Sequence, residues 1–198
     1  MIKIIGLTGR SGAGKGYVSD HFARIGIGSI DTDRVSRIVT GPGSPCLMEL
    51  AEHFGDDIID NDGSLKRREL ASLAFSSPEE TAVLNSITHK YILSETRRMI
   101  SEAGERGEDL IIVDAPQLFE SGFDKLCDVT VGVIADDDIC LERIIKRDGI
   151  NENEAKKRLS RQFTNEYFIE RCDYIIINNN KEDIAEAVRR IAIMLKSE

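Results

Sequence analysis

A glycine-rich loop with a single lysine stands near the start of the chain, at Gly9-Arg10-Ser11-Gly12-Ala13-Gly14-Lys15-Gly16. Glycine adopts backbone conformations that other residues avoid, so such a loop can turn several N–H groups inward around an anion. The lysine adds a mobile positive charge, and a helix that begins at the loop adds the positive end of its dipole. These residue types at this spacing predict a phosphate-binding loop, the P-loop.

The segments that flank this loop are the strand and the helix that a P-loop requires. Ile2–Leu7 is an apolar run typical of a short buried strand, and Tyr17–Ile25 has the apolar spacing of a helix. At Gly16 the usual pattern has Ser or Thr, whose hydroxyl is a ligand of Mg²⁺, and glycine has no side chain for that role. An ordinary glycine-rich turn with an exposed lysine is the alternative interpretation.

Length, charge and cysteine spacing limit the class of protein. The chain has 198 residues and a formal net charge of −9, which predicts one compact domain without the basic face that nucleic-acid binding needs. No apolar run approaches the roughly 20 residues that span a bilayer, and the N-terminus enters a strand without a signal peptide. Cys46, Cys127, Cys140 and Cys172 have no C-x-x-C spacing and are expected to be free thiols in a reducing compartment. We therefore expect a cytoplasmic protein with no membrane partner.

Five short apolar segments are the candidate strands: Lys3–Leu7, Gly28–Ile30, Leu110–Val113, Val129–Ile134 and Tyr174–Ile177. They show little alternation and are separated by helical patterns, which predicts a doubly wound α/β fold with a parallel sheet covered on both faces. Ligands of such sheets bind beyond the carboxyl ends of the strands. The P-loop should therefore share one edge of the sheet with three polar segments: Asp31–Asp33, Asp114–Pro116 and Asn178–Asn180.

A long and mostly helical excursion, about residues 34–109, separates the second and third candidate strands. Its predicted helices begin at Ser44-Pro45, at Leu65 and at Ser77, and they end at Gly55, at Phe75 and near Ala103. Ser77 and Glu80 have the spacing of a capping box. An insertion of this size exceeds a simple crossover, so we expect it to bind a second substrate that accepts the phosphoryl group.

The one dense basic cluster of this acidic chain follows the fourth candidate strand, in two predicted helices, Asp136–Gly149 and Asn151–Gln162. Its members are Arg143, Lys146, Arg147, Lys156, Lys157, Arg158 and Arg161. Beside a P-loop, this cluster is expected to form a lid that closes over the nucleotide and excludes water. A solvated helical face with ion pairs four residues apart is the alternative.

In chain order, these segments resemble those of the dephospho-CoA kinase family. The resemblance rests on Ile5–Gly9, Asp31-Thr32-Asp33 with Val35 and Arg37, Leu65-Lys66-Arg67 with Leu70 and Phe75, Ile87-Thr88-His89, Asp114–Gly122, Arg143 with Arg147–Gly149, Glu154-Ala155 with Arg158 and Gln162, and Asp173–Asn178. It covers nearly the whole chain and is far more specific than a P-loop alone. The chain departs from the family pattern at Gly16, Lys90, Gln117 and Cys172.

The resemblance implies ATP-dependent phosphorylation of the ribose 3′-hydroxyl of dephospho-CoA, which gives coenzyme A and ADP, with ATP as co-substrate and Mg²⁺ as cofactor. It also implies a three-layer P-loop kinase fold with a five-stranded parallel sheet, in one domain of residues 1–198. Within that domain we expect a core of residues 1–33, 110–135 and 173–198, a helical acceptor-binding region of about residues 34–109, and a helical lid of about residues 136–165.

The same comparison assigns roles to residues of this chain. The expected ATP-binding residues are Gly9, Ser11, Gly12, Ala13, Gly14, Lys15, Gly16, Tyr17, Arg143, Arg147 and Asn178. The expected acceptor-binding residues are Thr8, Asp31, Asp33, Arg37, His89, Pro116, Leu118, Phe119 and Glu120. Lys15, Asp33, Arg143 and Arg147 are the expected catalytic residues, and the resemblance implies that Asp33 accepts the proton of the acceptor hydroxyl. Asp33 and Asp114 are the candidate Mg²⁺ ligands.

Several of these residues also have plain structural interpretations. Asp33 could cap a helix, Asp114 could cap the turn that follows it, Asn178 could form a turn, and His89 could be a packed helical residue. Two other functions stay open: a kinase for another small acceptor such as a nucleotide, which the departures at Lys90 and Gln117 permit, and a non-catalytic nucleotide-binding protein. The sequence leaves the oligomeric state open.

Overall fold

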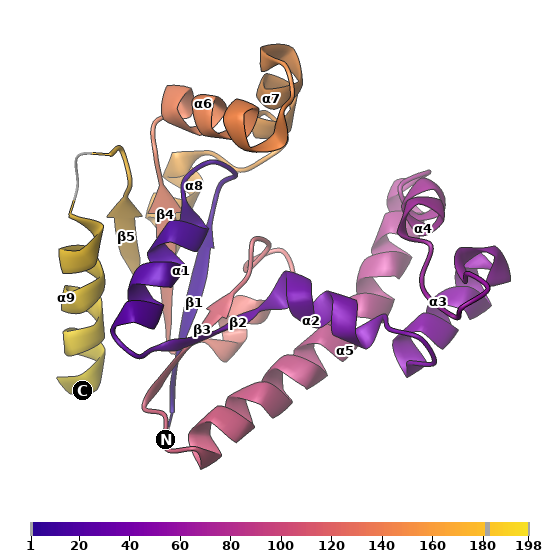
Figure 1. Ribbon diagram of the computed structural model, residues 1–198, viewed down its shortest axis with the longest axis horizontal. Helices are drawn as coiled ribbons and strands as arrows, with labels where there is room; N and C mark the ends of the chain where they lie inside the picture. Colours follow the sequence, from indigo (N-terminus) through magenta and orange to yellow (C-terminus); the bar gives the residue numbers. More distant parts are fainter. Residues whose placement is uncertain (1, 181–182, 198) are drawn as a thin grey trace. The chain divides into compact units, whose positions relative to one another are not determined.

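The computed structural model describes residues 2–180 and 183–197 (Figure 1). The chain divides into two compact units. Unit 1 comprises Met1–Ser29 and Ala103–Glu198, and unit 2 comprises Ile30–Glu102. The boundary between them falls within strand β2 (Gly28–Asp31) and near the end of helix α5 (Pro78–Glu105).

A five-stranded parallel sheet with the order β2-β3-β1-β4-β5 is the framework of unit 1. Its other strands are β1 (Lys3–Gly9), β3 (Leu110–Asp114), β4 (Val129–Ile134) and β5 (Tyr174–Ile177). β1 pairs with β3 on one side and with β4 on the other. The register places Leu7 opposite Asp114, so the carboxyl end of β3 lies beside the start of the P-loop.

The predicted α/β fold is confirmed, and the strand predictions differ from the structure only at their ends. The sequence analysis ended the first strand at Leu7 and the third at Val113, whereas the structure continues them to Gly9 and Asp114. An apolar pattern marks where side chains are buried, but strand pairing uses backbone groups and continues through polar residues and glycine.

The helices of unit 1 are α1 (Lys15–Arg24), α6 (Asp137–Asp148), α7 (Glu152–Leu159), α8 (Asn165–Arg171) and α9 (Ile184–Ser197). Helices α1 and α9 pack against each other and against the sheet around a core that includes Phe22, Ile112 and Val188. A capping box begins α7, where Asn151 and Glu154 each accept a backbone N–H of the other, next to the predicted helix start at Asn151. Helix α7 ends three residues before the predicted Gln162, and the short helix α8 was not predicted.

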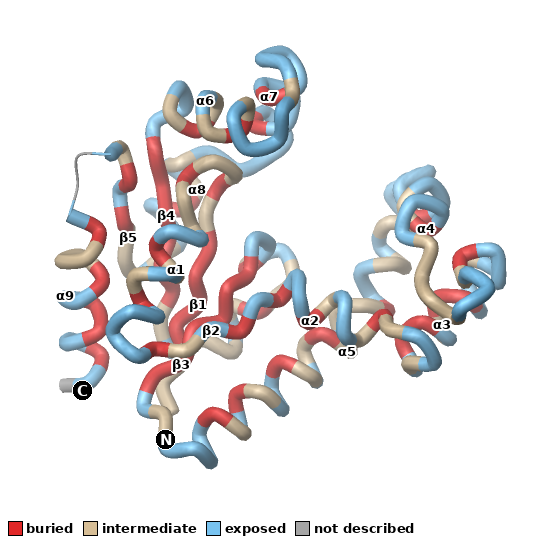
Figure 2. Tube along the Cα trace, viewed as in Figure 1, coloured by how far each residue is buried: buried red, intermediate tan, exposed pale blue. Residues whose placement is uncertain are grey.

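Unit 2 is helical, with α2 (Thr32–Val39), α3 (Pro45–Phe54), the 3-10 turn η1 (Asp56–Ile58), α4 (Arg67–Ala74) and most of α5. The predicted ends of α3 are confirmed, since Ser44 caps it and Gly55 follows it. A separate apolar core holds these helices together and includes Leu50, Ile58, Leu70 and Ile87. Buried residues lie mainly in the strands and on one side of most helices (Figure 2).

The start of α5 confirms half of the predicted capping box. The Ser77 hydroxyl accepts the backbone N–H of Glu80 at 3.1 Å, as predicted. The Glu80 carboxylate instead pairs with Nε2 of His53 at 2.8 Å, which ties α5 to α3.

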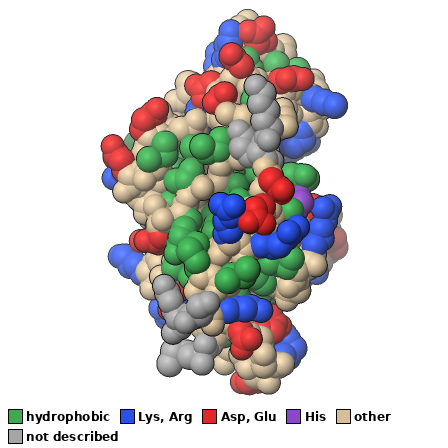
Figure 3. Space-filling view, turned by 90° about the vertical axis from the view of Figure 1, so that its left-hand side faces the viewer, with side chains coloured by type: hydrophobic (Ala, Val, Ile, Leu, Met, Phe, Trp, Pro, Cys, Tyr) green, Lys and Arg blue, Asp and Glu red, His purple; other side chains and the backbone are tan. Residues whose placement is uncertain are grey.

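The surface of unit 1 carries exposed hydrophobic side chains on the side of α9, among charged groups of both signs (Figure 3). Ile193 and Met194 of α9 are among the exposed large hydrophobic residues. Across the described part of the chain, no helix has the length and apolar character that a membrane span needs. All four cysteines are free thiols.

Candidate active site

The P-loop connects β1 to α1, and two of its glycines are required by the geometry. Gly12 has a φ of 83° and Gly14 a φ of 93°, in the region that favours glycine. A Cβ atom at Gly12 would lie 2.5 Å from the carbonyl oxygen of Cys140, and one at Gly14 would overlap Nδ2 of Asn178. The chain therefore needs glycine here both for backbone conformation and for space.

Lys15 at the start of α1 forms an ion pair with Asp114 at the end of β3. Both groups are largely buried, with 19% of the lysine side chain and 12% of the aspartate side chain exposed. The structure thus brings together two of the predicted site residues and holds the lysine charge at the mouth of the P-loop. Asp114 lies at the end of a buried strand, which is where the sequence analysis placed a carboxylate for phosphate chemistry.

Arg143 of α6 binds the backbone of the P-loop. Its Nη1 donates to the carbonyl oxygens of Gly12 at 3.1 Å and Ala13 at 3.3 Å. Its Nη2 donates to the carbonyl oxygen of Asn178 at 3.0 Å and to Oδ1 of Asn180 at 2.5 Å. The guanidinium therefore shapes the loop in this structure, and its role as a phosphate clamp stays a prediction.

Asn178, the residue after β5, supports the P-loop from the same side. Its buried side-chain amide donates to the carbonyl oxygen of Ala13 at 2.8 Å, and its backbone N–H donates to Ile134 at 2.8 Å. The sequence analysis assigned Asn178 to ATP, where it stays a prediction, but did not find this bond to the loop. A residue 165 positions away leaves no local signal for such a contact.

Ser11 of the P-loop makes two further contacts with the predicted lid. Its backbone N–H donates to Oε1 of Gln162 at 2.8 Å, and its hydroxyl accepts from Nη2 of Arg147 at 3.1 Å. Gln162 entered the sequence analysis only through the family pattern, and the structure gives it a partner in the phosphate loop.

Arg147 also belongs to an exposed charge cluster at the end of α6. Its Nε and Nη2 donate to the carboxylate of Asp148 at 2.7 and 2.9 Å, and Arg158 of α7 pairs with the same carboxylate. These two guanidinium groups, Arg147 foremost, lower the pKa of Asp148 below its ordinary value. An ionised Asp148 therefore holds Arg147 next to the loop.

We expect Arg147→Ala to reduce turnover by about 10- to 100-fold, because it removes a charge-assisted donor beside the loop. The free energy of unfolding should change by no more than about 0.5 kcal/mol, since the side chain is exposed. Steady-state kinetics and urea unfolding measure the two effects, with Lys146→Ala as the control for loss of a neighbouring exposed charge. Unchanged kinetics would return Arg147 to the solvated-face interpretation.

Arg10 is a site residue that the sequence analysis did not single out. Its side chain is only 6% exposed, and Nη1 pairs with Oδ1 of Asp137 at 2.5 Å. This pair joins the second residue of the P-loop to the first residue of α6. The sequence shows only that an arginine lies between the glycines of the loop, and this pattern does not indicate where its side chain points or which residue it pairs with.

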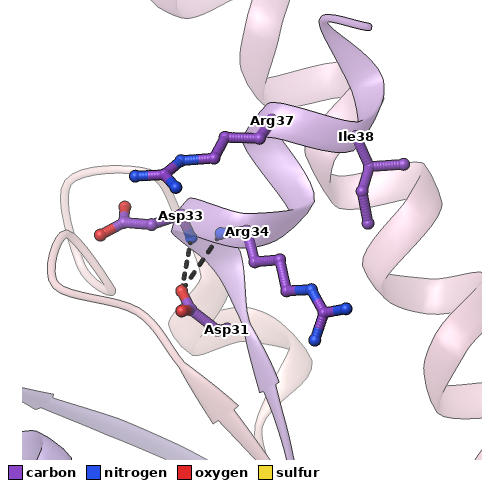
Figure 4. Close-up of a pocket in the computed structure, with 5 residues that line it drawn as sticks. All are labelled: Asp31, Asp33, Arg34, Arg37 and Ile38. Carbon is purple, nitrogen blue, oxygen red and sulfur yellow. Dashed lines mark hydrogen bonds between the residues drawn. The ribbon is translucent and has the colours of Figure 1, made fainter.

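The acceptor-side residues of unit 2 surround a pocket of about 580 Å³ (Figure 4). Asp31, Asp33, Arg34, Arg37 and Ile38 line it. Figure 4 shows the side chains of Asp33 and Arg37 extending to the same side of α2, whereas Arg34 and Ile38 extend to the other. Two carboxylates and two guanidinium groups in one pocket suit a ligand with a hydroxyl group and a phosphate.

The two aspartates of this pocket have different tasks. Asp31 caps α2, because its Oδ1 accepts the backbone N–H groups of Asp33 at 2.8 Å and Arg34 at 3.3 Å. The capping interpretation that the sequence analysis considered for Asp33 therefore applies to Asp31. Within the described residues, no donor binds the Asp33 carboxylate, which is exposed and available to a ligand.

The predicted acceptor contacts of unit 1 fall into two groups. Thr8 and Leu118 are buried, and the Thr8 hydroxyl donates to the carbonyl oxygen of Pro116 at 3.4 Å. Pro116 and Glu120 are exposed, and Phe119 is half-buried with its ring 6.0 Å from that of Tyr167. Direct contact with the acceptor stays a prediction for all of them, and in this structure Thr8 and Leu118 are packing residues.

His89 of α5 is half-buried and does not line the pocket around Asp33. Burial lowers the pKa of its imidazole below the ordinary value, which favours the neutral ring. The neighbouring departure from the family pattern, Lys90, pairs with Glu49 of α3 at 2.5 Å and so contributes to packing between helices.

The residues of this chain fit a Mg²⁺ ion only in a minor role. Gly16 offers no hydroxyl, and the Asp114 carboxylate is paired with Lys15. Among the residues that the structure describes, no three His, Cys, Asp or Glu side chains lie together as possible metal ligands. This donor set matches an ion held mainly by phosphate oxygens and water, as Mg²⁺ often is.

Comparison with known proteins gives one family. The dephospho-CoA kinase family model matches residues 3–183. Dephospho-CoA kinases of Corynebacterium glutamicum and Corynebacterium efficiens are 39% and 40% identical to the chain, over 96% of it and 96% of their own length.

Solved structures agree with this result at the level of the fold. A Thermus thermophilus protein has a TM-score of 0.81 at 26% identity, with 98% of each chain covered. A dephospho-CoA kinase of Campylobacter jejuni has a TM-score of 0.72 at 21% identity over 98% of each chain. Shikimate kinase of Acinetobacter baumannii has a TM-score of 0.53 at 16% identity, over 100% of this chain and 94% of its own. The fold is therefore that of the P-loop kinases, and this chain belongs to the dephospho-CoA kinase family.

Proposed function

We propose that this chain transfers the γ-phosphoryl group of ATP to the ribose 3′-hydroxyl of dephospho-CoA, giving coenzyme A and ADP. The observation that carries the proposal is the family match over residues 3–183, which includes both the P-loop and the pocket at Asp33. The acidic charge of the chain favours small-molecule substrates over nucleic acid, and we expect the reaction in the cytoplasm.

The phosphate side of the reaction belongs to the P-loop. Its N–H groups and the Lys15 ammonium would bind the β- and γ-phosphates, where charge develops during phosphoryl transfer. Arg147 lies against Ser11 and would place a guanidinium next to the same phosphates. Arg143 and Asn178 would act by holding the loop carbonyls, so that the N–H groups face inward.

The acceptor side belongs to the pocket on α2. The Asp33 carboxylate would accept the proton of the 3′-hydroxyl as that oxygen attacks the γ-phosphorus. Arg37 on the same side of the helix, and Arg34, would bind the diphosphate of dephospho-CoA. Asp31 would act as a positioning residue, because it fixes the first turn of α2 that carries Asp33.

Mg²⁺ would be held by ATP oxygens and water, with Asp33 or Asp114 as the carboxylates that could reach it or its waters. When bound, it supplies charge neutralisation at the transferring phosphoryl group. The missing hydroxyl at Gly16 is then tolerated, because Mg²⁺ commonly keeps several waters and few protein ligands.

Gly16→Ser should therefore give at most a modest gain in turnover. A side chain fits at this position, since a Cβ atom there would meet nothing within 4 Å. Gly16→Ala is the matched control, because both variants gain helix stability and only the serine adds a hydroxyl. The measurement is kcat at several Mg²⁺ concentrations. A rise from no turnover to full turnover in Gly16→Ser alone would show that the natural chain lacks a metal ligand it needs.

The proposal is tested by measuring ADP release in four reactions that contain ATP and Mg²⁺. Three of them contain dephospho-CoA, AMP or CMP as the acceptor, the fourth contains no acceptor, and the mass of each product is determined. We expect a product heavier by one phosphate from dephospho-CoA alone. Turnover of AMP or CMP instead would give a kinase for another acceptor. Binding of ATP or dephospho-CoA without any turnover would give a non-catalytic protein.

A further inference from the structure

A second pocket of unit 2, of about 190 Å³, lies between helices α2, α4 and α5. Its apolar wall includes Leu65, Leu70 and Leu84, and its polar groups include Thr40, Arg67 and Thr88. Within the described residues that line it, none is acidic. The proposed function does not yet use this pocket.

Helix α2 connects this second pocket with the pocket around Asp33. Asp33, Ser36, Arg37 and Thr40 are spaced i, i+3, i+4 and i+7, so they share one face of the helix. Asp33 and Arg37 line the first pocket, and Ser36 and Thr40 line the second. The rise of 1.5 Å per residue puts about 10 Å between the two ends of this face.

From this continuity we propose that the second pocket binds the pantetheine arm of dephospho-CoA, the neutral chain that extends from the diphosphate. The inference rests on the proposed function. Along this face of α2, Asp33 would serve the ribose hydroxyl and Arg37 the diphosphate, while Ser36 and Thr40, which line the second pocket, would serve the arm.

The chemistry of the pocket fits such an arm. The arm carries two methyl groups on one carbon, a hydroxyl and two amides, and the leucine wall suits the methyl groups. Arg67 is held at the pocket, because its Nη2 donates to the Thr40 hydroxyl at 3.1 Å, and that hydroxyl donates to the Ser36 carbonyl oxygen at 2.7 Å. Guanidinium N–H groups are donors for amide carbonyls.

Phe75 at the same pocket is unusually exposed for a large hydrophobic residue, at 67%. An apolar chain lying in the pocket would cover part of this ring.

The test fills the pocket and leaves the rest of the site unchanged. Ala71→Trp places an indole in the pocket, and Ser72→Trp on the same helix is the control, because Ser72 is exposed and does not line it. We expect Ala71→Trp to raise KM for dephospho-CoA by about tenfold or more and to leave KM for ATP unchanged. Ser72→Trp should leave both constants unchanged.

A truncated acceptor separates the arm from the rest of the substrate. The methyl ester of adenosine 5′-diphosphate keeps the ribose and the diphosphate but lacks the arm, and its Ki as a competing acceptor against dephospho-CoA reports binding of the substrate without the arm. We expect its Ki to be the same in Ala71→Trp and in the unaltered protein. The proposal would be overturned if Ala71→Trp raised this Ki in proportion to the KM for dephospho-CoA. It would also be overturned if Ala71→Trp and Ser72→Trp had the same KM for dephospho-CoA.

Phe75→Ala provides a second variant that does not depend on tolerance of a large residue in the pocket. It should raise KM for dephospho-CoA by about threefold through lost apolar contact, whereas Leu73→Ala, an exposed residue of α4 outside the pocket, should not. Equal effects of these two variants would overturn the proposal. Failure of the proposed function would appear separately, as no turnover by the unaltered protein. In that case, dissociation constants of dephospho-CoA measured by calorimetry for the same variants would show whether the second pocket binds the arm.

Discussion

Asp33→Asn is expected to lower turnover by about 10²- to 10⁴-fold, because an amide of the same shape cannot accept the proton of the acceptor hydroxyl. The carboxylate is exposed in its pocket and is not used to cap α2, a task that Asp31 performs. Affinity for ATP should be unchanged, since the substitution leaves the P-loop intact. Single-turnover kinetics and ATP titration measure the two quantities.

Asp31→Asn is the matched control for this experiment. It makes the same chemical change two residues away, and asparagine caps helices as well as aspartate does. We expect it to keep the first turn of α2 and to lower turnover far less than Asp33→Asn. Near-normal turnover by Asp33→Asn would remove Asp33 as the proton acceptor, and equal losses in both variants would indicate a general effect of pocket charge.

Lys15→Met should also remove most turnover, by about 10²- to 10³-fold or more, because it deletes the cation that binds the transferring phosphates. It should in addition destabilise the fold by about 1–3 kcal/mol, since it leaves the largely buried Asp114 carboxylate without the lysine. Loss of activity in this variant alone would therefore mix chemistry with stability.

The double variant Lys15→Met with Asp114→Asn separates the two effects. Neutralising the carboxylate removes a buried charge that no longer faces the lysine, so stability measured by urea unfolding should recover. Turnover should not recover, because the phosphate cation is still absent. Recovery of both would mean that Lys15 acts in folding and not in phosphate binding.

The parts of this protein that the sequence analysis predicted well are those with local signals. The P-loop follows from glycine and lysine spacing between a strand and a helix, and the caps at Ser44 and Asn151 follow from side chains that bind N–H groups three residues away. The five strands follow from short apolar runs, because a parallel sheet is buried on both faces.

The contacts that could not be predicted join residues far apart in the chain. Gln162 to Ser11 spans 151 positions and Arg10 to Asp137 spans 127, and no local pattern marks either partner. Asp31 caps α2 because the helix begins at Thr32. The exact residue at which a helix begins is difficult to predict from the local sequence. The pocket proposed for the arm is lined by residues of three helices, so it forms only when these helices pack together and has no local sequence pattern.

The bonds from Arg143 and Asn178 to the P-loop have a consequence for the synthesis of the protein. A ribosome makes the phosphate loop well before Asn178, which lies 165 positions later and holds the Ala13 carbonyl oxygen. A nascent chain released before β5 and Asn178 would have the glycines and the lysine but not the supports that shape the loop. Tight ATP binding should therefore arise only after β5 and Asn178 have been made, and chains that end before them should not compete for the nucleotide.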